Sequence, residues 1–354
     1  MTVGDVLAGL APPATSFASD NTAGVDPAVF AALAAANTPK ALAYGADDLS
    51  AEGVAAFREL LGIPAEVLWC WGGTGANVVG LATMLAPWQA IICADTAHIV
   101  VDECGAPARF GGSSIIPVAT PDGKLVPASI ERYVHWQGSA HHPQPGAISI
   151  SQVTEMGTVY SRDELAALAE TAHAHSMLVH LDGARIANAV ASTGCDLASL
   201  VVETGVDVMT FGMTKNGAMY GDVVLFLRPE LARAAKFVHK QAAQLPSKTR
   251  FVAAQALALL DGDRWIENGR HANAMAQRLA NAVGAIGDVR LDGSPQANAV
   301  FARLATPAWE ALQEWSFFWP WDRATDHVRW MTSFATTRED VDVFAAAVMA
   351  AVAA

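Results

Sequence analysis

The segment FGMTKNGAMYGDVVLFL, residues 211–227, places a lysine between two apolar runs. VDVMTFG at 206–212 leads into Lys215, and DVVLFL at 222–227 follows the small residues after it. Lysine is rarely buried unless it is paired or bonded, although one at a strand end can also extend its amine to solvent. The position of Lys215 between two predicted buried strands is therefore the feature from which we interpret the chain.

Short apolar runs alternate with helical patterns along the first two thirds of the sequence. The segment 161–176 predicts a helix that begins with a capping box, with Ser161 as the cap and Glu164 three residues later. Repeated strand-then-helix units predict an α/β fold with a mostly parallel sheet wrapped by helices. The predicted strands are 65–71, 90–96, 113–119, 146–152, 177–185, 206–212 and 222–227.

The pattern changes near residue 250. Residues 250–283 predict a helix, a break at DGD, and a second helix. The short strands and helices that follow alternate in a pattern different from that of the first two thirds of the chain. We therefore divide the chain into a large domain, 1–250, which includes the N-terminal segment, and a smaller α+β domain, 251–354.

Composition excludes several classes of protein. The 354 residues are 52% hydrophobic and carry a net charge of −13 without a run of Lys or Arg, so we expect no nucleic-acid partner. The apolar C-terminal segment 343–354 is shorter than the ~20 residues needed to span a bilayer, and predicts a packed helix and no membrane partner. Cys70, Cys93, Cys104 and Cys195 form no CxxC motif, and we interpret them as reduced core thiols of a cytoplasmic protein.

A desolvated lysine at a strand-to-loop junction has a lowered pKa and can react with a carbonyl. Pyridoxal phosphate uses such a lysine, together with a carboxylate for its ring nitrogen and a cradle for its phosphate. Asp182 ends an apolar run 33 residues before Lys215, as expected for neighbouring strand ends in an α/β sheet. Asp182 could alternatively cap the helix that follows it.

The segment WGGTGANVVG, 71–80, is the candidate phosphate cradle. Its glycines free backbone amides at the start of a predicted helix, and Thr74 adds a hydroxyl. The same segment could be the loop of a nucleotide-binding protein, but it has neither GxGxxG nor Walker spacing. His98 follows a strand and could stack on a cofactor ring, while Arg185 and Arg329 could bind a carboxylate. We assign no metal.

Taken together, these motifs resemble the threonine aldolase family, pyridoxal-phosphate enzymes of fold type I in the β-eliminating lyase superfamily. The resemblance covers nearly the whole chain, and the order of GGTGAN, HLDGAR and TKNG is its most specific part. It implies an aspartate-aminotransferase-like large domain with a mostly parallel seven-stranded sheet, and a smaller C-terminal α+β domain. It also implies a homodimer or homotetramer with shared active sites.

The resemblance implies a role for each matching residue. Lys215 would hold the cofactor aldehyde and Asp182 the ring nitrogen. Gly73 and Thr74 would hold the phosphate, with Lys248 near the phosphate of a neighbouring subunit. The remaining implied roles are ring stacking for His98, carboxylate binding for Ser19, Arg185 and Arg329, a site-lining position for Tyr44, and a place near the substrate hydroxyl for Glu103.

This chain departs from the family at one place. Many members carry ENTHN where this chain has SQVTEMG, residues 151–157, so a histidine that could contact the β-hydroxyl is missing. His141 and His142 could fill that space, or they could lie in a surface loop. We expect His98, directly or through water, to be the base.

The implied reaction is retro-aldol cleavage of an L-β-hydroxy-α-amino acid, of the L-threonine or L-allo-threonine type, to glycine and an aldehyde. Two alternatives stay open: a preference for L-phenylserine, and another β-eliminating lyase or racemase reaction on the same site. The tryptophans of EWSFFWPWD, 314–322, slightly favour an aryl substrate, although we expect them in a hydrophobic core or a subunit contact.

Overall fold

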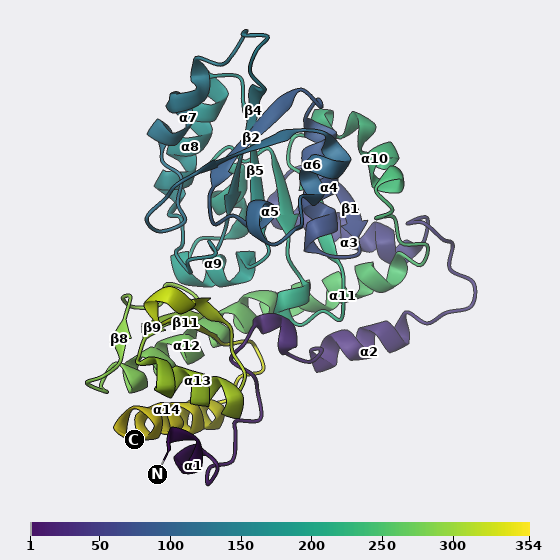
Figure 1. Cartoon of the computed structure of the whole chain (residues 1–354). Helices are drawn as coiled ribbons and strands as arrows, with labels where there is room; N and C mark the ends of the chain where they lie inside the picture. The colour runs from purple at the N-terminus through teal and green to yellow at the C-terminus, as the bar shows by residue number, and fades with distance from the viewer. Residues whose placement is uncertain (1) are drawn as a thin grey trace.

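The computed structural model describes residues 2–354 and forms two units, each built around its own sheet (Figure 1). Within these residues the larger sheet has seven strands in the order β1-β7-β6-β5-β4-β2-β3. All seven strands predicted from the sequence are present: β1 (Glu66–Cys70), β2 (Gln89–Ala94), β3 (Ser114–Val118), β4 (Gln144–Ser151), β5 (Leu178–Gly183), β6 (Val208–Phe211) and β7 (Asp222–Phe226). β7 alone runs in the direction opposite to the other six strands, which confirms a mostly parallel sheet.

The central strands are buried along nearly their whole length because helices cover the sheet. Helix α8 begins at the predicted capping box, in which Ser161 and Glu164 each bond the other's backbone amide. The helices of this unit are α2 (Pro27–Ala35), α3 (Asp48–Leu61), α4 (Gly73–Met84), α5 (His98–Val101), α6 (Ala106–Gly111), α7 (Pro127–Val134), α8 (Arg162–Ala174), α9 (Ile186–Thr193), α10 (Ala235–Gln241) and α11 (Arg250–Leu260).

The smaller unit is a four-stranded antiparallel sheet covered by helices. Its strands lie in the order β10-β11-β9-β8, namely β10 (Pro320–Asp322), β11 (His327–Met331), β9 (Ala299–Arg303) and β8 (Arg290–Leu291). The predicted break at DGD is present as a short turn between α11 and α12. The helices are α12 (Arg264–Val283), α13 (Thr306–Trp315) and α14 (Arg338–Ala353).

The N-terminal segment contacts the smaller unit. Leu7 of α1 (Val3–Leu7) and Phe17 are buried in its core, and both chain termini lie at that end of the molecule (Figure 1). The chain then crosses to α2 on the larger unit. The boundary at residue 250 stays a prediction, but the N-terminal segment that we grouped with the large domain packs in part on the other unit.

The cysteines differ in their surroundings. Cys70 and Cys93 are buried as predicted, and Cys195 is half-buried. The interpretation of Cys104 as a core thiol is wrong, because it lies exposed in a turn between α5 and α6. Among residues 2–354, no helix has the length and apolar character needed to cross a membrane.

A close contact between two helices joins the units. Gly269 of α12 faces α9, and a Cβ at this position would lie 2.6 Å from the carbonyl carbon and oxygen of Ala187. Because α9 begins directly after Arg185, this contact also helps to hold the arginine-bearing end of β5 against the smaller unit.

We therefore predict that Gly269→Ala lowers the free energy of unfolding by about 1–3 kcal/mol, because the added methyl group overpacks the α9–α12 contact. The higher helix propensity of alanine, worth ~1 kcal/mol, opposes this loss. Urea denaturation would measure the change. Gly287→Ala is the control, because a Cβ at Gly287 meets no atom within 4 Å. Equal stability of the two variants would contradict the prediction.

Candidate active site

A cleft of about 890 Å³ lies where the carboxyl ends of the parallel strands meet the smaller unit. Ligands of open α/β sheets commonly bind at this edge. The cleft brings together nine residues that the sequence singled out: Ser19, Gly73, Thr74, His98, Glu103, Asp182, Arg185, Lys215 and Arg329.

Lys215 enters the cleft from a short turn, Thr214–Asn216, which begins shortly after the end of β6. The residue is half-buried, and its amine has no side-chain hydrogen bond or ion pair within residues 2–354. Burial and the nearby charge of Arg185 lower the pKa of Lys215, against the attraction of surrounding carboxylates. The neutral, nucleophilic amine is therefore more accessible here than in an ordinary exposed lysine.

Asp182 lies at the carboxyl end of β5 and is held in one orientation. Its Oδ1 accepts a hydrogen bond of 3.0 Å from the Ala184 amide, and its Oδ2 accepts one of 2.8 Å from the side chain of Asn77. The amide oxygen of Asn77 accepts in turn from Thr210, at 2.7 Å. Sequence reasoning missed the role of Asn77, although this residue lies within the glycine-rich segment.

The N-terminus of α4 is open to the cleft. Gly72, its N-cap, has extended backbone and provides no side-chain cap, so the first amides of the helix are left for a ligand. Asp222, which the sequence analysis also missed, lies beside it: a Cβ on Gly73 would be 3.6 Å from its Oδ2. The Oδ1 of Asp222 accepts from the Met213 and Thr214 amides. Burial raises the pKa of Asp222, against the hydrogen bonds from the Met213 and Thr214 amides.

His98 and Glu103 form a pair on the wall of the cleft. Nδ1 of His98 lies 2.8 Å from Oε1 of Glu103, which also accepts from Asn77. The hydrogen bond to Glu103 raises the pKa of His98, although burial opposes this effect. His98 therefore takes up a proton more readily than an ordinary histidine.

Glu155, in the segment SQVTEMG, also lines the cleft. Its Oε1 accepts from the His98 amide at 2.9 Å and from the Ser151 hydroxyl at 2.8 Å. Its Oε2 is buried without a hydrogen-bond partner in the described chain. Burial, together with the negative charge of Asp182, raises the pKa of Glu155. The sequence analysis noted the missing histidine of this segment but not the carboxyl group that it carries.

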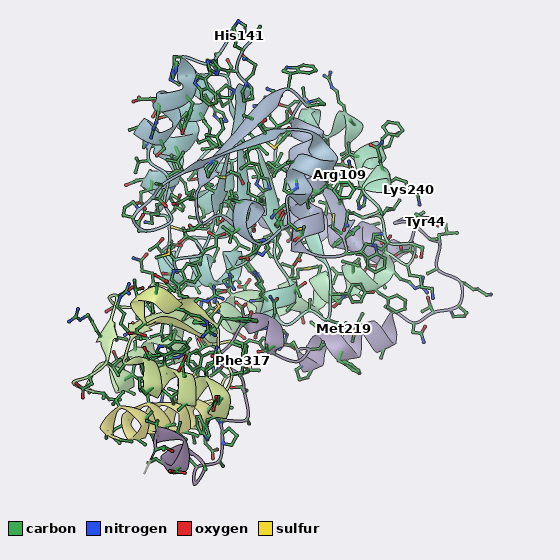
Figure 2. The ribbon with its side chains drawn as sticks, in the orientation of Figure 1. Tyr44, Arg109, His141, Met219, Lys240 and Phe317 are labelled. Atoms are coloured by element: carbon green, nitrogen blue, oxygen red, sulfur yellow. The ribbon has the colours of Figure 1, made fainter. Side chains whose placement is uncertain are left out.

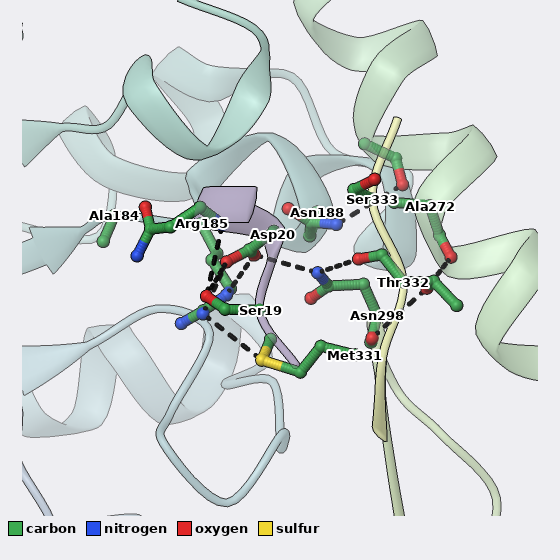
Figure 3. A network of polar contacts seen from close by, with 12 residues as sticks. Ser19, Asp20, Ala184, Arg185, Asn188, Ala272, Asn298, Met331, Thr332 and Ser333 are labelled. Atoms are coloured by element: carbon green, nitrogen blue, oxygen red, sulfur yellow. Dashed lines mark hydrogen bonds and ion pairs between the residues drawn. The ribbon is translucent and has the colours of Figure 1, made fainter. Parts of the chain in front are cut away.

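Arg185 lines the cleft but is held there by Asp20, and its predicted role in binding a substrate carboxylate stays a prediction. Its Nε and Nη2 donate to the two carboxylate oxygens of Asp20 at 2.6 and 2.9 Å (Figure 3). Asn298 donates to the same carboxylate at 3.0 Å, and Nη2 also contacts the sulfur of Met331. Asp20 was missed, although it follows the predicted Ser19. The buried pair joins the N-terminal segment to both units.

Arg329 is the freer of the two arginines. Its guanidinium lies 5.2 Å from the centre of the Trp321 ring, and its Nε is buried without a hydrogen-bond partner in residues 2–354. Burial and the charge of Arg185 lower its pKa to about 10. An anion entering the cleft would relieve both the unpaired donor and the repulsion between the arginines.

Trp319 and Trp321 line the cleft, so the expectation of a hydrophobic core is wrong for these two tryptophans, while a subunit contact stays a prediction. Trp319 is 55% exposed at the rim, where it packs edge-on against Phe317, also exposed. Phe318, from the same segment, is buried in the core of the smaller unit. Neighbouring aromatic residues of this segment, which leads into β10, therefore point to different environments.

His141, Tyr44 and Lys248 do not line this cleft. His141 lies in an exposed loop before β4, at the opposite end of the sheet (Figure 2). His141 therefore does not fill the space of the missing histidine in its own chain, and the same loop holds His142. Tyr44 and Lys248 lie in adjacent loops, where the Tyr44 amide donates to the Ser247 carbonyl at 2.9 Å. Their predicted roles across a subunit interface stay predictions.

The chain is similar to known lyases over most of its length. Residues 16–306 match the family model described as beta-eliminating lyase. Low specificity L-threonine aldolases from Pseudomonas aeruginosa and from another Pseudomonas strain are 42% and 40% identical over 305 residues, which cover 85% of this chain and 88% of each relative. The chain belongs to the threonine aldolase family. This confirms the resemblance stated from the motifs.

Solved structures agree with this family. A threonine aldolase structure from Leishmania major has a TM-score of 0.87 at 30% identity, covering 94% of this chain and 98% of that one. An aspartate aminotransferase from Rhodobacter sphaeroides has a TM-score of 0.70 at 18% identity, covering 96% and 92%. The second likeness concerns the fold alone, and it confirms the predicted aspartate-aminotransferase-like architecture.

The buried Arg185–Asp20 pair generates a stability prediction. We expect Asp20→Asn to lower the free energy of unfolding by about 3–5 kcal/mol at neutral pH, because it leaves Arg185 as an uncompensated buried charge. Burial opposes ionisation of Asp20, but the charges of Arg185 and Lys215 and its hydrogen bonds outweigh burial and hold the pKa of Asp20 below 3.8. The stability from this pair is therefore complete above that pH and is lost as the pH falls through the folded-state pKa.

Denaturant unfolding at several pH values would measure this difference. Asp342→Asn is the matched control, because Asp342 forms an exposed ion pair with Arg278 at 2.7 Å. Exposed pairs typically contribute about 0–1 kcal/mol. A loss in Asp20→Asn no larger than in Asp342→Asn would contradict the prediction.

Proposed function

We propose that this chain uses pyridoxal phosphate to cleave L-β-hydroxy-α-amino acids, of the L-threonine or L-allo-threonine type, into glycine and an aldehyde. The observation that carries the proposal is the meeting of Lys215, Asp182 and the open N-terminus of α4 in one cleft. The names of the relatives, low specificity L-threonine aldolase, support the same reaction.

The residues present fit pyridoxal phosphate. The lowered pKa of Lys215 suits attachment of an aldehyde, and its amine has no competing partner in residues 2–354. Asp182 presents a carboxylate whose orientation is held by Asn77 and Ala184, as a protonated ring nitrogen requires. The uncapped first turn of α4, at Gly73 and Thr74, suits a phosphate.

The cofactor, when bound, accepts the electron pair that is released at the substrate Cα. The side chains of the cleft position the reacting groups and exchange protons with them. Asp182 stabilises positive charge at the ring nitrogen, and His98 lies on the cleft wall where it can stack on the ring. Lys215 is placed to exchange a proton at Cα once its amine is free.

The substrate carboxylate would bind between the two units. Arg329 offers the unpaired Nε, and Ser19 offers a hydroxyl at the cleft wall. Arg185 contributes a positive charge at a fixed position in the cleft, since two of its nitrogens donate to Asp20. Holding the carboxylate in this way determines which Cα bond faces the cofactor, and therefore which bond breaks.

We expect the enzyme to be a cytoplasmic homodimer or homotetramer. Tyr44 and Lys248 lie beside one another at the surface, outside the cleft of their own chain. Both could complete the site of a neighbouring subunit, with Lys248 near its phosphate.

We predict that Lys215→Ala abolishes the visible absorption of bound pyridoxal phosphate and the release of aldehyde from L-threonine, because no amine remains to attach the cofactor. Absorption spectra and an aldehyde assay with glycine detection would measure both losses. Lys236→Ala, which changes an exposed lysine of α10, is the control. Formation of pyruvate by the wild type would indicate a β-eliminating reaction instead, and loss of stereochemistry at Cα would indicate a racemase.

A preference for L-phenylserine is the second candidate function. Trp319 and Trp321 form an aromatic wall of the cleft. Trp71 and Tyr220 also line the cleft, and their rings stack with 5.6 Å between the ring centres. Aromatic surfaces can hold an aryl group by stacking.

We therefore predict that Trp319→Ala lowers kcat/KM for L-phenylserine roughly 2–10-fold more than for L-threonine, in line with ~0.5–1.5 kcal/mol for an aromatic pair. Steady-state assays with both substrates would measure this ratio. Trp88→Ala, at an exposed position outside the cleft lining, is the control. An equal loss of kcat/KM for both substrates would contradict the proposed preference for an aryl substrate.

A further inference from the structure

Glu155 is a buried carboxyl group of the cleft that the proposed function leaves without a role. Its Oε1 is fully engaged by the His98 amide and the Ser151 hydroxyl, at 2.9 and 2.8 Å. These two donors fix the direction of the carboxyl group. Its Oε2 has no hydrogen-bond partner in residues 2–354, although it is buried.

A buried oxygen without a partner is unusual in a folded protein and calls for an explanation. Glu155 belongs to the cleft lining, beside His98 and close enough to Asp182 for their charges to interact. A polar group of a bound substrate would supply the missing partner. Apart from its amine and its carboxylate, a β-hydroxy-α-amino acid of the threonine type has one polar group, the β-hydroxyl.

The other candidates for contacting this hydroxyl are less suited to accept its proton. His98 bonds Glu103 through Nδ1, and this bond raises the pKa of His98, so at a given pH a free lone pair on Nε2 is less available than in an ordinary histidine. Glu103 accepts from His98 and Asn77 through Oε1, and its Oε2 is also buried without a hydrogen-bond partner in the described chain. However, its side chain is fully buried, whereas Glu155 is partly exposed at the cleft. His141 lies at the other end of the sheet.

We propose that Glu155 is the base for the substrate β-hydroxyl, in place of His98 and of the histidine that many family members carry in this segment. This inference rests on the proposed function. In the cleavage direction the proton of the β-hydroxyl passes to Oε2 of Glu155, and the oxygen electron pair forms the aldehyde C=O bond. The Cα–Cβ bond breaks and leaves its electron pair at Cα, where a proton is then added to give glycine. The proton on Glu155 returns to solvent.

The charges around Glu155 suit this role. Asp182 and burial raise its pKa, which makes its carboxylate a stronger base than an ordinary glutamate. Arg185 and Arg329 also interact with its charge, and the buried groups of Cys93 and Tyr160 face it from β2 and from the end of its own segment. Because the base must be ionised, cleavage should fall as the pH drops through the raised pKa of Glu155.

The decisive test compares two reactions of one holoenzyme. Cleavage of L-threonine requires a base at the β-oxygen, whereas exchange of the glycine α-hydrogen in deuterated water does not. Glu155→Gln keeps an oxygen that can accept from His98 and Ser151 but cannot ionise. We expect it to lower kcat/KM for cleavage roughly 10²–10⁴-fold, to remove the acidic limb of the pH profile, and to retain glycine exchange.

Two measurements do not depend on activity. The affinity for pyridoxal phosphate, titrated by absorption, should be the same in wild type and Glu155→Gln. An infrared difference spectrum of the two apo-proteins should contain the band of a protonated carboxyl group that disappears with rising pH. Glu170→Gln, on the exposed side of α8, is the control and should change none of these quantities.

Each result has a clear meaning. Wild-type cleavage by Glu155→Gln would overturn the inference, and loss of cleavage with retained glycine exchange in His98→Asn alone would assign the base to His98. Glu155→Asp should keep the acidic limb of the pH profile of cleavage, at a reduced rate. If neither Glu155→Gln nor Glu155→Asp binds pyridoxal phosphate, Glu155 only supports the structure of the cleft, and the inference fails. If the wild type itself neither binds pyridoxal phosphate nor exchanges glycine, it is the proposed function that fails.

Discussion

The site depends on the parallel alignment of the central strands. Because β4, β5 and β6 run in the same direction, their carboxyl ends reach one edge of the sheet. In the register of β5 and β6, Asp182 pairs with Thr210, a few residues before Lys215. A carboxylate and a lysine that lie far apart in the sequence are thus brought to one cleft by backbone hydrogen bonds, before any side-chain contact is considered.

The Arg185–Asp20 pair connects this edge to the rest of the molecule. Asp20 comes from the N-terminal segment, Arg185 follows β5, and Asn298 comes from the smaller unit. Breaking such a buried pair costs more than the pair contributes relative to apolar groups, so its main effect is to specify one arrangement of the three segments. That arrangement also places Arg329, the guanidinium with an unpaired nitrogen, opposite the sheet edge.

The carboxyl groups of the cleft differ because their surroundings differ. Asp20 is held ionised by Arg185, while burial raises the pKa values of Asp222 and Glu155. One fold can therefore provide both a carboxylate that stays ionised and carboxyl groups that take up a proton more readily than usual. The different pKa values of these carboxyl groups follow from their packing and their neighbours, and not from residue type.

Much of this protein can be read from its sequence, because strands, capping boxes and glycine-rich turns are local signals. The seven strands, the capped helix at Ser161 and the break at DGD follow from residue patterns within short windows. Lys215 and Asp182 were found in the same way, since each is a charged residue at the end of an apolar run. Only the tertiary structure decided that Arg185 is bound by Asp20, that Trp319 faces the cleft, and that Glu155 has a buried oxygen without a partner, because each of these depends on segments that meet only when the chain is folded.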